Sequence, residues 1–213
     1  LLMITPVNDN NPIITSNGGG ANASINVAEN TTAVSTITAT DADADLPTQT
    51  LSYAISGGAD AGRFSINTST GELRFKVAPN FESPIDAGSN NDYNFVVRVS
   101  DGSLTSTQAI SVTVSDINEF PVGPISDANG SVNAVNENSA NGTVVGVTAF
   151  ASDADATTNT VTYSLDDNAG GRFAINSTTG VVTVANGLLL DRESAASQNI
   201  IVRATSSDTS FTT

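Results

Sequence analysis

The sequence predicts an all-β protein made of two tandem, seven-stranded Greek-key β-sandwiches. Apolar residues alternate with polar ones along many short segments, and turn signals such as Gly57-Gly58 and Thr179-Gly180 separate these segments. A period of two is typical of strands with one buried face. About seven such strands in about 100 residues is the pattern of an antiparallel sandwich.

The second half of the chain repeats the first. The segment Gly62-Arg63-Phe64-Ser65-Ile66-Asn67 returns as Gly171-Arg172-Phe173-Ala174-Ile175-Asn176, and Val27-Ala28-Glu29-Asn30 returns as Val135-Asn136-Glu137-Asn138. Internal repetition of this kind indicates tandem domains rather than two lobes of one domain. We expect repeat 1 at residues 13–119 and repeat 2 at residues 120–213, whereas residues 1–12 correspond to the last strand and linker of a preceding repeat.

In repeat 1, we expect a first strand before Glu29 and a second before Asp41. Alternating runs then predict strands at 51–55, 73–77, 95–99 and 110–114. In repeat 2, the corresponding runs are 161–165, 182–184 and 200–204. No amphipathic helix is expected.

Repeat 2 has no run that matches the last strand of repeat 1, Ser111–Ser115. Instead, Leu1–Thr5 aligns with that strand when Asn8 is placed on Asn118. An unpaired edge and an open core are features that proteins avoid. Head-to-tail self-association through residues 1–5 therefore fits the sequence. A partly disordered second repeat, or a tail that this fragment omits, fits it equally.

Composition and charge exclude several classes of function. The 213 residues contain 22 Asp and Glu against 7 Lys and Arg, a net charge of −15, with no Cys, His or Trp. Thiolate nucleophiles, His bases and the usual zinc ligands are therefore absent. The charge disfavours nucleic acids and anionic membranes as partners. Apolar runs such as Leu188–Leu190 are too short for a membrane span, and with no visible signal peptide we expect an internal fragment if the protein is secreted.

Acidic residues gather at strand ends and in loops. Asp116, Asn118 and Glu119 lie within four residues, and such oxygen-rich stretches suit a hard cation that takes about 6 to 8 oxygen ligands. The motifs of both repeats resemble those of tandem extracellular cadherin repeats over nearly the whole chain. They are Glu29-Asn30, Asp41-Ala42-Asp43, Leu190-Asp191-Arg192-Glu193, Asp101-Gly102 and the linker Asp116-Ile117-Asn118-Glu119-Phe120-Pro121.

This resemblance implies that Ca²⁺ binds between consecutive repeats. At the central joint, the lower repeat would supply Glu29, Asn80, Glu82, Asp116 and Glu119, and the upper repeat Asp153, Asp155 and Asp208, with Asn118 and the Phe120 carbonyl between them. Two further sets of motif residues would lie at the ends of the repeats away from the central joint. The set of repeat 1 and its preceding linker is Asn8, Asp9, Asn10, Asp41, Asp43 and Asp101. The set of repeat 2 is Glu137, Asp191 and Glu193. The chain departs from the family pattern where Asn80 replaces an Asp, Glu119 replaces the second linker Asp, and Pro6 stands in place of the leading linker Asp.

The resemblance implies a calcium-dependent, extracellular cell-surface module for adhesion or structure, from a membrane-associated parent protein. The lack of Cys and the scarcity of Lys look more like the repeats of large bacterial surface adhesins than like animal cadherins. Direct adhesion and a spacer role both fit, and the alternative is a carbohydrate- or ligand-binding sandwich. Catalysis by a carboxylate pair such as Asp191 and Glu193 lacks a substrate cleft, so we expect no enzyme.

Overall fold

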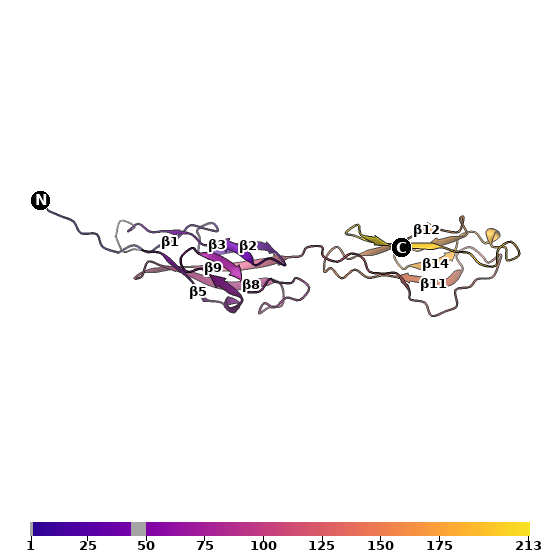
Figure 1. Ribbon diagram of the computed structural model, residues 1–213, viewed down its shortest axis with the longest axis horizontal. Coiled ribbons are helices and arrows are strands. Elements are labelled where there is room, and N and C mark those ends of the chain that lie inside the picture. Colours follow the sequence, from indigo (N-terminus) through magenta and orange to yellow (C-terminus); the bar gives the residue numbers. More distant parts are fainter. Residues whose placement is uncertain (1, 44–49) are drawn as a thin grey trace. The chain divides into compact units, whose positions relative to one another are not determined.

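The computed structural model describes residues 2–43 and 50–213 and divides the chain into two compact units, Leu1–Ile117 (unit 1) and Asn118–Thr213 (unit 2). Both units are built from strands (Figure 1). The only helical segments among the described residues are two short 3₁₀ helices, η1 (Ala61–Arg63) and η2 (Gly187–Leu189). The prediction of an all-β chain with two sandwich domains is confirmed.

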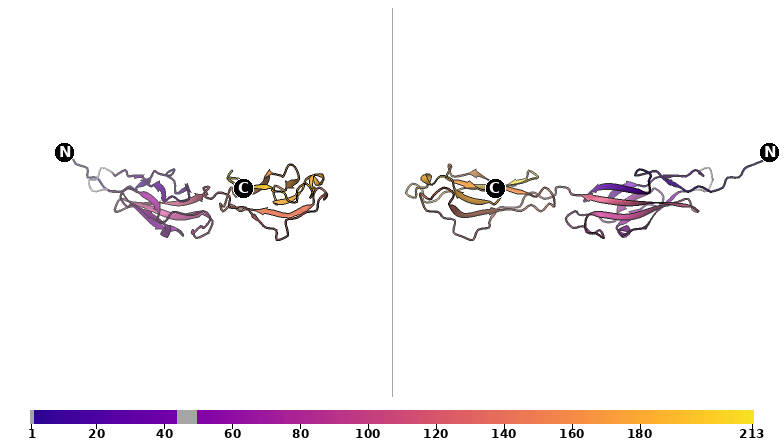
Figure 2. Two further views of the ribbon diagram at one scale, coloured as in Figure 1. Left: turned by 45° about the vertical axis from the view of Figure 1, so that its right-hand side comes forward. Right: turned by 180° about the vertical axis from the view of Figure 1, so that it is seen from behind.

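Unit 1 contains two sheets that face each other (Figure 2). The first has the order β2-β9-β8-β5, with β2 at Asn22–Ala28, β5 at Ser52–Gly57, β8 at Asp92–Ser100 and β9 at Thr105–Ser115. The second has the order β3-β7-β6, with β3 at Ala33–Thr36, β6 at Phe64–Ile66 and β7 at Glu72–Phe75. A short pair, β1 (Ile13–Ile14) with β4 (Ala39–Thr40), extends the sandwich.

The core of unit 1 is built from the residues that the alternating pattern places inside. Tyr93, Val97, Val99, Val112 and Val114 are each at most 1% exposed. The Phe64 ring stacks on Phe95 with centroids 4.1 Å apart and meets the Tyr93 ring edge to face at 6.0 Å. Offset and edge-to-face contacts of this kind add to the burial of the rings themselves. Aromatic residues of unit 1 thus form the core of the sandwich.

Two details of unit 1 differ from the sequence prediction. Strand β7 ends at Phe75, and Val77 is 70% exposed rather than inward-facing, because the chain bends at Lys76 and Val77. Residues Leu2–Thr5 form no strand and are exposed. Leu1, the remaining residue of that predicted strand, lies outside the described residues.

Unit 2 repeats this arrangement with fewer paired residues. Its first sheet has the order β10-β11-β14-β13, with β10 at Ser126–Asp127, β11 at Val144–Phe150, β13 at Phe173–Ile175 and β14 at Val181–Val184. Its second sheet has the order β12-β15-β16, with β12 at Val161–Asp167, β15 at Ile201–Ser206 and β16 at Phe211–Thr212. Buried Tyr163, Val182 and Ala204 correspond to core positions of unit 1.

The two units differ at one edge. In unit 1, β2 pairs in parallel with β9 from Asn22↔Ala109 to Ala28↔Ser115. In unit 2, the matching residues 130–136 form no strand, and no described strand lies in the place of β9 beyond the two residues of β16. β16 pairs with β15 where β9 begins its pairing with β8, so within the described residues unit 2 contains the first two paired residues of this strand.

Candidate metal centres

Carboxylates gather in three groups within the described residues. Each group offers three ligand oxygens that lie within 4.8 Å of one another. The groups are Glu29 with Glu82 and Asp116, Asp153 with Asp155 and Asp208, and Glu137 with Asp191 and Glu193. The first belongs to unit 1 and the other two to unit 2.

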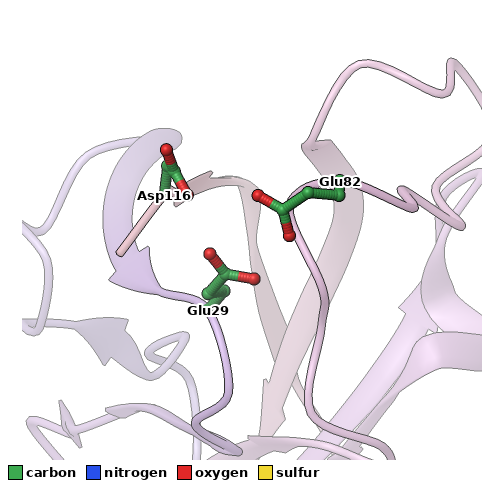
Figure 3. A group of neighbouring side chains, drawn as sticks. All are labelled: Glu29, Glu82 and Asp116. Carbon is green, nitrogen blue, oxygen red and sulfur yellow. The ribbon is translucent and has the colours of Figure 1, made fainter. Parts of the chain in front are cut away.

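The Glu29 group is brought together by three separate segments of unit 1. Glu29 follows β2, Asp116 follows β9, and Glu82 lies in the connection between β7 and β8. Their carboxylates face a common space (Figure 3). Glu29 is only 2% exposed, and it is fixed by the Ile117 N–H, which donates to Oε1 at 3.0 Å, and the Phe81 N–H, which donates to Oε2 at 2.8 Å. One buried carboxylate thereby holds the ends of both neighbouring segments.

The Asp153 group lies beside the residues with which unit 2 begins. Asp155 is 1% exposed, and its carboxylate accepts hydrogen bonds from the backbone N–H groups of Glu119, at 3.0 Å, and Phe120, at 3.2 Å. Asp153 Oδ1 accepts from the Asp155 N–H at 3.2 Å. The segment 119–120 is therefore tied to the Asp-x-Asp motif of unit 2.

Ser210 is a residue of this group that the motif comparison missed. Its backbone N–H and its hydroxyl both donate to Asp208 Oδ1 at 2.7 Å, and its Oγ accepts from the Val122 N–H at 2.8 Å. The hydroxyl of Ser210 holds the pKa of Asp208 below its ordinary value, which keeps the carboxyl ionised. An Asp followed two residues later by Ser also occurs at Asp101-Gly102-Ser103, and this local turn signal could have pointed to Ser210.

The other end of unit 1 repeats the tie between linker and Asp-x-Asp motif. Asp43 Oδ2 accepts from the N–H groups of Asn10, at 2.7 Å, and Asp9, at 3.0 Å, as Asp155 does from Phe120 and Glu119. The Asn10 amides, backbone and side chain, hold the pKa of Asp43 below its ordinary value. Residues 8–10 thus contact repeat 1 as residues 118–120 contact repeat 2.

Several predicted ligands lie outside the three groups. Asp41, Asp43 and Asp101 do not form a comparable group among the described residues, and Asp101 Oδ1 accepts from the Ser103 and Leu104 N–H groups. Asn80 Oδ1 accepts from the Ser83 N–H at 2.7 Å. The remaining predicted residues, Asn8, Asp9, Asn10, Asn118, Glu119 and Phe120, belong to the two linker segments.

The composition of the groups fits a hard divalent cation. All side-chain ligands are carboxylates or carboxamides, the oxygen donors that calcium prefers. Asp41 Oδ2 and Asp153 Oδ2 are buried and have no hydrogen-bond partner among the described residues. Burying an ionised oxygen without a partner is costly, so a cation beside these atoms would offset that cost. The residues present therefore fit Ca²⁺.

Comparison with known proteins identifies the type of repeat. The sequence model of the family described as "Cadherin domain" matches residues 23–115 and 132–213. The Drosophila melanogaster protein dachsous is 34% identical over 212 residues, which cover 96% of this chain and 6% of dachsous. Human protocadherin Fat 1 is 27% identical over 173 residues, 81% of this chain and 4% of Fat 1. The chain thus spans a small part of these relatives.

Solved structures agree with the sequence relatives. Mouse cadherin-23 EC22-24 superposes with a TM-score of 0.72 at 26% identity, covering 93% of this chain and 61% of that chain. Protocadherin gamma B2 extracellular cadherin domains 3–6 superpose with a TM-score of 0.73 at 22% identity, covering 96% and 50% of the two chains. The second likeness concerns the fold alone. Among the residues described, no helix is long and apolar enough to cross a membrane.

Proposed function

The chain belongs to the cadherin family, and on that premise we propose that it is a calcium-dependent extracellular module for cell adhesion or cell-surface structure. In this proposal, Ca²⁺ binding at the joint between the two repeats stiffens the chain. Cadherin repeats are extracellular adhesion and structural units. The lack of Cys and the scarcity of Lys are the support for the further proposal of a bacterial surface protein as parent.

Ligands from both repeats would hold the ion. Repeat 1 would supply its Glu29 group, and repeat 2 its Asp153 group, because the chain between Asp116 and Phe120 links the two groups covalently. The linker itself would add Asn118, Glu119 and the Phe120 carbonyl. Asn80 carries one charge fewer than the Asp of the family pattern, so we expect the part of the site next to Asn80 to bind most weakly.

The observation that carries the proposal is Asp153 Oδ2, a buried carboxylate oxygen without a hydrogen-bond partner among the described residues. Its neighbours in space are two more carboxylates, Asp155 and Asp208. The low pKa of Asp208 keeps negative charge in the group rather than removing it by protonation. An acidic surface that merely keeps a protein soluble would leave these oxygens in water, where they cost nothing.

Bound Ca²⁺ would neutralise carboxylates that otherwise repel one another at short range. Without this neutralisation, repulsion between carboxylates would favour separation of the Glu29 group from the Asp153 group. Extracellular calcium modules bind with dissociation constants on the order of 10⁻⁴ to 10⁻³ M. Such an affinity suits a chain that stiffens outside a cell.

Calorimetric calcium titration of single variants tests this function. Asp153→Asn keeps the acceptor for the Asp155 N–H but removes the charge, and Glu29→Gln does the same for the Glu29 group. We expect each variant to weaken calcium binding by about tenfold or more, since calcium affinity depends on ligand charge. Glu72→Gln is the matched control, because Glu72 pairs with Arg74 on the exposed hairpin. Equal titrations of all three variants and the wild type would contradict the proposal.

The carbohydrate-binding alternative requires a platform of exposed aromatic rings. Most rings of unit 1 are in the core, and Phe211, 58% exposed, already has the Arg203 guanidinium 4.0 Å above its ring. Phe120 and Phe150 are the other Phe side chains that stand out as exposed in the described part of the chain. We therefore keep the calcium-dependent module as the proposed function and propose no catalytic role.

Neighbouring cadherin repeats are the partners that this function implies. We propose in addition that copies of this chain associate head to tail through residues 1–5, because that segment aligns with the strand Ser111–Ser115 of repeat 1 when Asn8 is placed on Asn118.

A further inference from the structure

The turn between β15 and β16 carries Asp208 and differs from the turn between β8 and β9 in unit 1. It contains five residues, 206–210, whereas the turn of unit 1 contains four, 101–104. The carboxylate of the shorter turn is at its first position, Asp101, and that of the longer turn is at its third position, Asp208. Unit 2 therefore presents this carboxylate from a turn with a different backbone geometry.

Thr209 has a backbone conformation that a β-branched residue adopts only with strain. Its φ is +76°, in the left-handed region, where a Cβ crowds its own backbone. In the corresponding turn of unit 1, the residue with positive φ is Gly102, at +105°, and glycine adopts this region readily. Strained residues persist only where the surrounding structure over-determines them. The contacts around Thr209 therefore hold the turn in its conformation.

Ser210 holds the turn on one side. Its backbone N–H and its hydroxyl both donate to Asp208 Oδ1 at 2.7 Å, and its Oγ accepts from the Val122 N–H at 2.8 Å. Val122 is 6% exposed and belongs to the core of unit 2. A single hydroxyl group thereby connects the Asp208 carboxylate to a core residue at the start of the same unit.

Ser206 holds the turn on its other side. This residue is 4% exposed, its backbone O accepts from the Thr209 N–H at 3.0 Å, and its hydroxyl donates to Thr158 O at 2.9 Å. Thr158 is the other β-branched residue with positive φ in the described part of the chain, at +32°, and it lies three residues after Asp155. The strain is thus concentrated in the two loops that carry the Asp153 group, as it is in many ligand clamps.

We propose that Ser210 and Thr209 are positioning residues for calcium, in which Ser210 holds a strained turn and the turn keeps the Asp208 carboxylate within reach of Asp153 and Asp155. The oxygens of these three residues lie within 4.8 Å of one another. The calcium dependence of this role rests on the proposed function. The role itself adds a hydroxyl and a backbone conformation to the carboxylates on which the affinity depends.

Positioning affects affinity because a group that is not held must be ordered when the ion binds. The apparent affinity falls in proportion to the fraction of molecules that have the competent arrangement. Without the Ser210 hydroxyl, Asp208 loses a donor and the Val122 N–H loses its acceptor. The strain at Thr209 then favours relaxation of the turn away from the left-handed region. Strain therefore makes the loss of Ser210 more costly than the loss of its hydrogen bonds alone.

Calorimetric calcium titration of the full chain tests the role of the hydroxyl. We expect Ser210→Ala to weaken calcium binding by about tenfold, since a hydrogen bond to a charged group is lost, and Ser210→Thr to bind as the wild type does, because Thr keeps the hydroxyl. Ser103→Ala is the matched control, because Ser103 also donates its backbone N–H to the Asp two residues before it, at 2.7 Å, but its side chain is exposed. Equal titrations of Ser210→Ala and the wild type would overturn the proposal.

Hydrogen exchange in chelator gives a readout that does not depend on calcium. The Val122 N–H is expected to be protected in the wild type and in Ser210→Thr, and to exchange faster in Ser210→Ala, because its acceptor is removed. Protection that is the same in all three proteins would show that the Ser210 hydroxyl does not connect the turn to Val122.

Thr209→Gly tests the strain. In chelator, we expect this substitution to raise the melting temperature of unit 2 by about 4 °C or more, because glycine removes left-handed strain. Gly102→Thr is the reverse change in unit 1, at a position where nothing lies within 4 Å of an added Cβ, and it should lower the melting temperature of that unit. Thermal unfolding of both variants checks these two shifts of opposite sign.

A double-mutant cycle links the strain to calcium binding. When Thr209→Gly has already removed the strain, Ser210→Ala should weaken calcium binding less than it does beside Thr209. Additive effects of the two substitutions would overturn the coupling between strain and binding. Equal calcium affinity in the wild type and all variants refutes the positioning role alone, whereas a wild type that binds no calcium refutes the proposed function and the role with it.

Discussion

At the scale of single residues, the same side chain has two environments in the two repeats. Glu29 is 2% exposed and accepts two backbone hydrogen bonds, whereas its counterpart Glu137 is exposed and accepts one from Arg192. The difference arises because the segment after β9 covers Glu29. The burial of Glu29 therefore depends on a segment that is distant from it in sequence.

A second buried carboxylate, Asp86, gives a prediction about pH. Its oxygens accept from the N–H groups of Gly88, Asn90 and Asn91. Burial raises the pKa of Asp86, but these hydrogen bonds outweigh burial and the pKa is held below the ordinary 3.8. The stabilisation is present above the unfolded-state pKa and is lost as pH falls through the lower folded-state pKa.

We therefore expect Asp86→Asn to destabilise unit 1 by on the order of 1 to 3 kcal/mol at pH 7 and by much less at pH 2. Thermal unfolding of wild type and variant at both pH values, in chelator so that calcium does not contribute, measures the difference. A gap between the two melting curves that is the same at both pH values would show that the charge of Asp86 contributes nothing.

At the scale of elements, both repeats contain a hairpin turn that tolerates only glycine. Gly71 and Gly180 have φ of +73° and +68°, and an added Cβ would lie 2.0 Å from Ile37 O or 2.1 Å from Ala149 O. We expect Gly71→Ala to cost about 2 kcal/mol or more, because left-handed strain and a backbone clash act together. Gly62→Ala, where nothing lies within 4 Å, is the control, and chemical denaturation of both variants compares them.

The sequence predicted the strands whose pattern is local and missed features that depend on distant partners. Alternation around Tyr53, Val97 and Val112 was enough to place β5, β8 and β9. It could not show that Val77 lies beyond the end of β7, where the chain bends at Lys76 and Val77. Nor could it show that residues 130–136 form no strand, since the matching β2 depends on β9 for its hydrogen bonds.

In the candidate site as well, the sequence predicted the residues with a local motif and missed the contacts that depend on distant partners. Motif spacing singled out Asp153, Asp155 and Asp208, and the structure brings their oxygens within 4.8 Å of one another. Spacing gave no indication that Asp155 would be fixed by the N–H groups of Glu119 and Phe120. Backbone donors carry no sequence signature, so these contacts become visible only when the fold is known.

At the scale of the whole molecule, the net charge of −15 predicts a dependence on salt. In chelator, like charges destabilise the folded state, and raising the ionic strength from about 0.01 M to about 0.15 M shortens the screening length from about 30 Å to about 8 Å. We expect the melting temperature in chelator to rise over this range of sodium chloride. Calorimetric scans at both concentrations measure it, and a falling melting temperature would contradict the prediction.

The parallel pairing of β2 with β9 determines how unit 1 would respond to mechanical force. The chain enters the pair at Asn22 and leaves it at Ser115, and parallel strands place these two residues at opposite ends of the ladder. Tension along the chain would therefore shear the ladder, loading its hydrogen bonds together, instead of peeling them apart one after another.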